Sequence, residues 1–180
     1  MNYIILDLEA TCWKDRSIQK QSEIIEIGAL KINAEGKIVS EFCAFIKPKL
    51  NPVLSDFCIE LTTITQNEID KADSYESVIE AFKQWINLKN SYLLCSWGFY
   101  DKKQFLKDCK LHSLDTDWLK NHISLKHQYA DIKNLNKPIG MGGALKKEKL
   151  TLEGTHHRGI DDARNISKIF ISNIDKWKIS

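Results

Sequence analysis

Two ten-residue segments rich in isoleucine, valine and phenylalanine constrain the fold of this chain more than any other feature. They are EIIEIGALKI (23–32) and KIVSEFCAFI (37–46), and the four residues NAEG lie between them. β-Branched and aromatic residues favour strands, and a short segment with asparagine and glycine favours a turn. The pattern therefore predicts a β-hairpin.

Further strands and helices are expected on both sides of the hairpin. YIIL (3–6) is a short apolar run typical of a central, doubly covered strand, and SYLLCSW (91–97) is a second β-like run. A hairpin that precedes alternating helices and strands predicts an α/β domain with a mixed central β-sheet flanked by α-helices. Helices are expected over 74–87 with Ser74 as N-cap, over 101–111, over 142–150 and over 161–177. We expect an irregular connection with short helical turns over 47–73 and make no firm assignment for 113–140.

Length and composition indicate one globular domain over residues 1–180. The net charge of +2 is too small to indicate nucleic acid or membrane binding by itself. No apolar run approaches the roughly 20 residues of a membrane span, and the N-terminus lacks the basic start of a signal peptide. The five cysteines are odd in number and form no CxxC pair, which indicates reduced thiols rather than disulfides or a zinc site. We therefore expect a cytoplasmic protein that does not bind membranes.

Lysines gather in one part of the chain. Between Leu119 and Lys149 there are seven of them against only Asp131 and Glu148. Such a segment can form a solvated surface, or it can line a rim that contacts phosphates. The sequence leaves both interpretations open.

Three acidic residues follow or end the apolar strands. Asp7 and Glu9 are two residues apart at the end of the first strand, so their side chains share one face. Asp101 lies just after the second strand, where the chain turns into a helix. Ligand groups often lie at such strand ends in open α/β sheets. A D-x-E pair occurs often by chance, however, and an acid at a helix start is common because the helix dipole favours it.

The segment HHRGIDDARN (156–165) supplies a fourth acid and two histidines. On a helix, Asp162 aligns with the apolar stripe that faces the sheet, whereas Asp161 aligns with the solvent side. Five residues of a continuous helix turn through about 500°, which would place His157 and Asp162 about 140° apart around the helix. His157 can therefore reach Asp162 only from a loop that bends back. Geometry favours His157 only modestly over His156, and we expect His156 to point away.

The three acidic segments together resemble the DEDDh 3′→5′ exonucleases, a branch of the ribonuclease H-like superfamily. LDLEATCW resembles the first motif of that family, SWGFYD the second and HHRGIDDARN the third, while IIEIGAL and LTTIT resemble segments between the first two. These segments are most similar to those of the Eri-type exoribonucleases, which trim structured and small RNAs. The resemblance extends from about Tyr3 to Phe170, which implies a ribonuclease H-like fold and a single exonuclease domain.

The resemblance also implies roles for individual residues. The four acids would bind two Mg²⁺ or Mn²⁺ ions, the hard cations that oxygen ligands suit, and His157 would act as the general base. The expected substrate is a nucleic acid with a free 3′ end, RNA rather than DNA, and no protein partner can be inferred. The predicted metal ligands are Asp7, Glu9, Asp101 and Asp162, and the predicted substrate contacts are Ala10, Thr11, Trp13, Trp97 and Phe99.

Three other functions are compatible with parts of the pattern. A DNA 3′→5′ exonuclease of the proofreading type would use the same acids, because recognition of the ribose 2′-hydroxyl depends on loop geometry. A catalytically silent nucleic-acid-binding module would have no use for converging carboxylates that repel phosphate. A ribonuclease H-like endonuclease is disfavoured by the histidine of the third motif.

Overall fold

A computed structural model describes residues 1–15, 17 and 20–179 of the chain, and it contains one six-stranded mixed sheet. The strand order is β4-β3-β2-β1-β5-β6, with β1 at the centre, antiparallel to β2 and parallel to β5. The α/β prediction with a mixed central sheet is confirmed. The strands are β1 (Asn2–Ala10), β2 (Ile24–Ile32), β3 (Ile38–Lys47), β4 (Asp73–Ser74), β5 (Tyr92–Ser96) and β6 (His122–Ser124).

The predicted hairpin is present as β2 and β3. Its strands pair from Glu26 opposite Phe45 to Ile32 opposite Ile38. The connecting turn is closed by a hydrogen bond from the Gly36 N–H to the Asn33 carbonyl, and Gly36 has a φ of 78°, a conformation that glycine adopts without strain. The asparagine and the glycine of NAEG thus form the turn between the two strands, as the sequence predicts.

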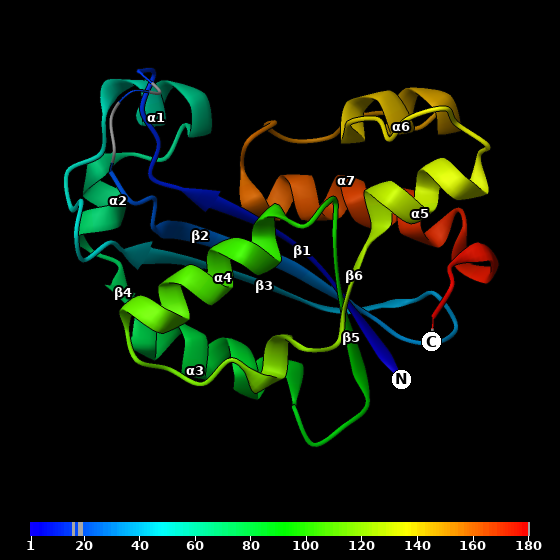
Figure 1. The fold of residues 1–180 in the computed structure, drawn as a ribbon, viewed down its shortest axis with the longest axis horizontal. Helices are drawn as coiled ribbons and strands as arrows, with labels where there is room; N and C mark the ends of the chain where they lie inside the picture. Colours follow the sequence, from blue (N-terminus) through cyan, green and yellow to red (C-terminus); the bar gives the residue numbers. More distant parts are fainter. Residues whose placement is uncertain (16, 18–19, 180) are drawn as a thin grey trace.

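Helices cover both faces of the sheet (Figure 1). α3 and α4 pack on one face, where Phe82 and Phe105 join the apolar side chains of β1. α5, α6 and α7 cover the other face, where Tyr129 and Phe170 are buried. The helices are α1 (Asp56–Thr62), α2 (Gln66–Asp70), α3 (Tyr75–Ile86), α4 (Tyr100–Leu111), α5 (Leu125–Ile132), α6 (Met141–Glu148) and α7 (Gly159–Ile171).

The alternation of side chains along β1 places the first acidic pair. Ile4, Leu6 and Leu8 belong to the core beneath α3 and α4, whereas Tyr3 and Ile5 belong to the core beneath α5, α6 and α7. Because side chains two residues apart share a face, the residues after Ile5 on that face are the acids at positions 7 and 9. The acids therefore extend an apolar row toward α7.

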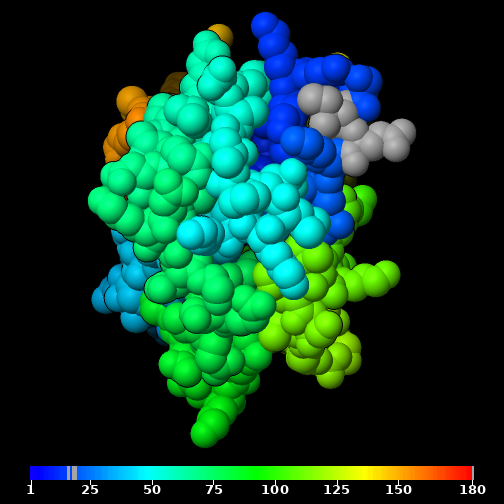
Figure 2. Space-filling model, turned by 90° about the vertical axis from the view of Figure 1, so that its left-hand side faces the viewer, coloured from blue at the N-terminus to red at the C-terminus, as the bar shows by residue number. Residues whose placement is uncertain are grey.

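α1 and α2 lie at the end of β1, where the chain leaves the sheet. The Ser55 hydroxyl caps α1 and donates to the carbonyl of Cys12, and the Cys58 thiol lies 3.8 Å from the carbonyl of Ala10. Figure 2 shows the resulting contact between the early segment (blue) and the segment that contains α1 and α2 (cyan to green). The irregular connection expected over 47–73 thus contains two short helices, of which α1 contacts the end of β1 and α2 packs against β3.

Both ends of the C-terminal helix differ from the prediction. α7 begins at Gly159 and ends at Ile171, rather than running from 161 to 177. A short 3-10 turn follows, and Trp177 folds back to stack on Phe170 with ring centroids 5.6 Å apart. The apolar Trp177 is buried by this reversal and not by a longer helix. The stretch 113–140, which has no sequence-based assignment, contains β6 and α5. The strand β6 has three residues and is therefore too short to show the two-residue alternation of a strand. None of the helices in the described part of the chain is long and apolar enough to cross a membrane.

Candidate active site

Three of the four predicted acids meet at one point. Asp7 and Glu9 come from β1 and Asp162 comes from the first turn of α7, and each offers a carboxylate oxygen within 4.8 Å of the others. Glu9 and Asp162 are buried and Asp7 is partly exposed, so the cluster opens to solvent on one side. The prediction that Asp162 rather than Asp161 faces the sheet agrees with this geometry.

The carboxylates repel one another strongly. Desolvation, followed by the charges of Asp101 and Glu9, raises the pKa of Asp7 well above its usual range. Burial, followed by the charges of Asp162 and Glu26, raises the pKa of Glu9 to about 8. Like charges this close favour protonation of one another unless a cation neutralises them. The cluster is thus a site of high negative potential.

Asp101 lies at the edge of this cluster. It is in the first turn of α4, and its Oδ1 accepts the backbone N–H of Leu8 at 3.2 Å, which ties α4 to β1 between the two acids of that strand. Burial raises its pKa to about 6, although hydrogen bonds to the carboxylate act in the opposite direction. It is the neighbouring charge that raises the pKa of Asp7 most. Asp101 therefore belongs to the same electrostatic unit as the other three acids.

Two glycines allow α7 to reach the sheet. A Cβ on Gly28 of β2 would lie 2.1 Å from the carbonyl carbon of Gly159, and a Cβ on Gly159 would lie 3.1 Å from the carbonyl oxygen of Asp7. The start of α7 thus rests directly on the backbone of β1 and β2. Gly159 is the first residue of α7, and its lack of a side chain permits this close approach.

A buried glutamate that sequence reasoning missed holds the start of α7 in place. Glu26 is fully buried, and its Oε2 accepts the N–H of Gly159 at 2.9 Å and the Nε–H of Arg158 at 3.3 Å. It lies opposite Glu9 in the register of β1 and β2. The signal was present in the sequence, because Glu26 is the one acid inside the apolar run IIEIGAL.

The two histidines are arranged differently from the expectation. The expectation that His156 points away is wrong: its Nδ1 lies 3.0 Å from both carboxylate oxygens of Asp162. His157 contributes its backbone N–H to Asp162 Oδ2 at 3.1 Å, and its ring stacks on that of His156 with centroids 4.0 Å apart. The cause is the left-handed conformation of His157 itself, with a φ of 66°, which turns the chain before α7 begins.

Asp161 has the structural role expected of it. Its carboxylate accepts the N–H of Thr155 at 2.8 Å and pairs with Arg164 at 3.0 Å. A Cβ on Gly154, which has a φ of 75°, would lie 2.3 Å from the carboxyl carbon of Asp161. Asp161 therefore supports the loop that carries the histidines and points away from the acids.

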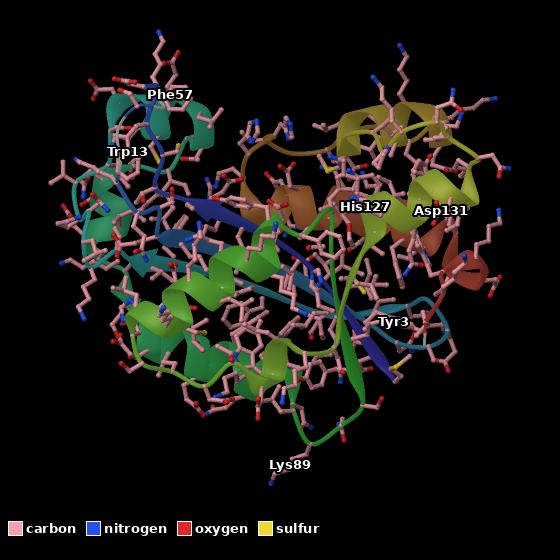
Figure 3. All side chains as sticks on the ribbon, in the orientation of Figure 1. Tyr3, Trp13, Phe57, Lys89, His127 and Asp131 are labelled. Atoms are coloured by element: carbon pink, nitrogen blue, oxygen red, sulfur yellow. The ribbon has the colours of Figure 1, made fainter. Side chains whose placement is uncertain are left out.

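The five predicted substrate contacts occupy different environments. Ala10 is buried, and the Thr11 hydroxyl accepts the N–H of Glu23 at 3.0 Å. Trp97 donates to the carbonyl of Ile139 at 3.1 Å and packs with the core beneath α5 and α6. Trp13 lies in the part of the molecule that α1 occupies (Figure 3), with Lys20 5.4 Å from its ring.

Phe99 is the most exposed of the five. The residue is 47% exposed, and the centroid of its ring lies 5.0 Å from that of His127 on α5. An exposed aromatic side chain directly before the helix that carries Asp101 is available to stack on a base. Contact of these five residues with a substrate stays a prediction.

The donor set fits a hard divalent cation. Carboxylate oxygens are the ligands that Mg²⁺ and Mn²⁺ prefer, and a bound cation would offset the burial and the repulsion that raise the pKa values of Asp7 and Glu9. The exposed edge of Asp7 gives a cation access from solvent. The arrangement is suited to binding metal ions beside a phosphate.

Comparison with known proteins agrees with this geometry. The chain is 35% identical over 184 residues to ERI1 exoribonuclease 2 of Danio rerio, covering 90% of this chain and 33% of that protein. It is 31% identical over 176 residues to human 3′-5′ exoribonuclease 1, covering 93% of this chain and 50% of that protein. The chain thus spans between a third and a half of the length of these two relatives.

The fold and the sequence profile point to the same family. The nuclease domain of 3′hExo, described as a DEDDh family member bound to rAMP, superposes with a TM-score of 0.92 at 29% identity, covering 99% of this chain and 96% of that one. The profile of the Exonuclease family (RNase_T) matches residues 4–170, which include all four acids and both histidines. This chain belongs to the Exonuclease family.

Proposed function

We propose that this chain is a metal-dependent 3′→5′ exonuclease that removes nucleotides one at a time from the free 3′ end of RNA. The observation that carries the proposal is the convergence of Asp7, Glu9 and Asp162 on one partly open point, with Asp101 beside them. Similarity to exoribonucleases over nearly the whole chain supports RNA as the substrate class.

The four acids would hold two Mg²⁺ or Mn²⁺ ions. When bound, two such ions stabilise the negative charge on the attacking and leaving oxygens of a phosphodiester. Asp7 would contact both, because it lies within 4.8 Å of Glu9 and Asp162 and is also the acid whose pKa the charge of Asp101 raises. Glu9 and Asp162 would complete one position, and Asp101 would contribute to the other.

His157 would accept the proton of the attacking water. Desolvation and the neighbouring His156 lower the pKa of His157 below its usual value of 6.5, so its ring is neutral at pH 7 and can take up a proton. The water oxygen would bond to the terminal phosphorus while the bond from phosphorus to the 3′-oxygen of the preceding nucleotide breaks. That 3′-oxygen takes a proton and becomes the new 3′-hydroxyl, and a nucleoside 5′-monophosphate leaves.

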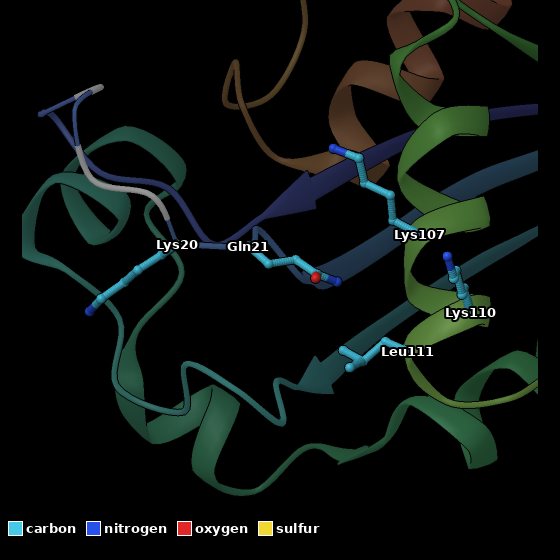
Figure 4. A pocket seen from close by; sticks show the side chains of 5 residues that line it. All are labelled: Lys20, Gln21, Lys107, Lys110 and Leu111. Carbon is cyan, nitrogen blue, oxygen red and sulfur yellow. The ribbon is translucent and has the colours of Figure 1, made fainter.

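A basic hollow beside α4 offers a path for the upstream nucleotides. Lys20, Lys107 and Lys110 line it together with Gln21 and Leu111 (Figure 4). Within the described residues, none of the three lysines lies within 4.0 Å of a carboxylate, whereas Lys120 and Lys133 of the lysine-rich segment are engaged in ion pairs. Because an α-helix rises 1.5 Å per residue, Lys107 and Lys110 lie about 9 and 14 Å along the axis of α4 from Asp101.

The salt dependence of RNA binding tests this path. If Lys107 and Lys110 each contact a phosphate, replacing both by alanine should reduce the slope of log affinity against log salt by about 1.4 for a single strand. Lys89→Ala is the control, because Lys89 lies at the far end of the molecule from the acids (Figure 3). An unchanged slope in the double variant would place the RNA elsewhere.

The activity itself is tested with 5′-labelled single-stranded RNA and DNA of the same sequence, in Mg²⁺ or Mn²⁺. We expect a ladder that shortens from the 3′ end of RNA, weaker on DNA, absent with EDTA and absent in Asp7→Ala. His157→Ala should lose about 10²–10⁴-fold of the rate, the usual contribution of general base catalysis.

The alternatives give different patterns in the same assay. A stronger ladder on DNA would retain the mechanism and change the substrate. Cleavage of a circular RNA would indicate an endonuclease. Binding of RNA without cleavage in either metal would indicate a binding module, and full activity in His157→Ala would contradict the assignment of the base.

A further inference from the structure

The pair of histidines beside Asp162 forms a second cluster of metal-binding side chains. His156, His157 and Asp162 each offer a ligand atom, and these atoms lie within 4.8 Å of one another. Asp162 belongs both to this cluster and to the acid cluster, so the two cannot hold different metals independently. In the proposed exonuclease mechanism His156 neither holds a metal ion nor accepts a proton, and it acts only by lowering the pKa of His157.

The donor chemistry of the histidine cluster differs from that of the acid cluster. Two imidazole nitrogens and one carboxylate oxygen are a typical set for Zn²⁺, whereas carboxylates alone suit Mg²⁺ and Mn²⁺. Three protein ligands leave a coordination position open to water. The acids at positions 7 and 9 add negative potential that favours any dication at this point.

The histidines are held close together and are accessible. Their rings stack with centroids 4.0 Å apart, and Nδ1 of His156 is already 3.0 Å from both oxygens of Asp162. The side chain of His156 is 51% exposed, so a cation can reach it from solvent. The hydrogen bond from the His157 N–H to Asp162 fixes the loop relative to α7.

We propose that His156, His157 and Asp162 form a Zn²⁺ site whose occupation inhibits the exonuclease. The ion would withdraw two groups from catalysis, the ring of His157 and the carboxylate of Asp162. The inhibitory role rests on the proposed function, whereas Zn²⁺ binding does not. His156 is the ligand that serves this site alone.

Zn²⁺ binding is measured first, on metal-free protein without RNA, by competition with a fluorescent zinc indicator. The wild-type chain should bind one ion tightly, and His156→Ala and His156→Gln should each bind it at least tenfold more weakly. Cys12→Ser and His127→Ala are the controls, because Cys12 and Cys58 are a neighbouring thiol pair and His127 is an exposed histidine outside the cluster. Both controls should bind as the wild type does.

Co²⁺ reports on the ligands directly. It should give the absorption bands of a low-coordinate nitrogen and oxygen site in the wild type, without the intense charge-transfer band of a thiolate. Those bands should be lost in His156→Ala. Equal Zn²⁺ affinity in wild type and both His156 variants, or loss of binding in Cys12→Ser, would overturn the proposed site.

Inhibition is measured separately, by titrating Zn²⁺ at fixed Mg²⁺ in the RNA assay, with each variant compared with its own rate without Zn²⁺. The concentration for half inhibition should rise at least tenfold in His156→Ala and stay unchanged in Cys12→Ser. Tight Zn²⁺ binding that leaves the rate unaffected would overturn the inhibitory role. An absence of RNA cleavage by the wild type would refute the proposed function and leave the binding result standing.

Discussion

The carboxylate of Glu26 on β2 accepts the backbone N–H of Gly159 at 2.9 Å, which holds the first residue of α7 against the sheet. The same carboxylate pairs with Arg158, the residue that precedes the helix. Because Asp162 lies three residues further on, the position of this acid depends on a residue of another element, β2. Glu26 is a positioning residue in this arrangement.

Replacing Glu26 by alanine should lower both stability and activity. It would leave the buried Gly159 N–H without a partner, and an unsatisfied buried donor costs about 1–3 kcal/mol. Glu41→Ala is the matched control, because the Glu41–Arg164 pair is exposed and such pairs contribute about 0–1 kcal/mol. Urea denaturation and the RNA assay measure the two effects. Equal losses of stability in both variants would contradict the role of Glu26.

The adjacent aspartates of α7 should respond differently to loss of charge. Asp162→Asn removes a carboxylate from the acid cluster and should reduce the rate at least 100-fold in Mg²⁺, because the site depends on several converging charges. Asp161→Asn keeps a side-chain oxygen for the Thr155 N–H and should change the rate less than tenfold. Rates in Mg²⁺ and Mn²⁺, with circular dichroism to verify folding, measure the difference. A larger loss in Asp161→Asn would reverse the assignment.

The acid cluster should make the metal-free protein less stable as pH rises. The pKa of Glu9 is raised from 4.5 to about 8, so the folded state holds a proton that the unfolded chain releases. Stability is then fully present below pH 4.5 and is lost progressively as pH rises toward 8. Glu9→Gln should therefore raise the stability of the metal-free protein at pH 8 by roughly 1 kcal/mol or more, while it abolishes activity.

Thermal unfolding in EDTA between pH 5 and 8 measures this effect. The difference between Glu9→Gln and wild type should shrink toward pH 5, and Mg²⁺ should stabilise the wild type more than the variant. A Glu9→Gln protein that is less stable than the wild type throughout this range would show that the folded state does not raise the pKa of Glu9.

The sequence predicted those parts of the fold and site that depend on local patterns. The hairpin, the Ser74 cap and the grouping of Asp7 with Glu9 follow from composition and the two-residue period of a strand. The orientation of Asp162 follows in the same way from the helical stripe. These features need no knowledge of distant contacts.

The features that could not be predicted depend on tertiary contacts. His156 reaches Asp162 because His157 adopts a positive φ, a conformation that no local pattern required. β6 is too short to show a period and forms because β5 offers an open edge. Trp177 is apolar whether a helix or a reversed chain buries it, so the end of α7 was placed too late. In none of these cases does the local pattern of residue types decide the outcome.

The contact between Gly28 and Gly159 should tolerate no side chain at Gly28. In Gly28→Ala the new Cβ would lie 2.1 Å from a backbone carbon of α7, and backbone atoms cannot move aside as a flexible side chain can. The helix would have to move away from β2, separating Asp162 from Asp7 and Glu9. We expect a loss of several kcal/mol in stability and at least a 100-fold loss in rate.

Gly142→Ala is the matched control, because a Cβ there meets no atom within 4 Å and alanine favours the helix α6. That variant should gain up to about 1 kcal/mol and keep its rate, as urea denaturation and the RNA assay would show. A Gly28→Ala protein with wild-type stability and rate would mean that α7 does not rest on β2 as closely as this geometry requires.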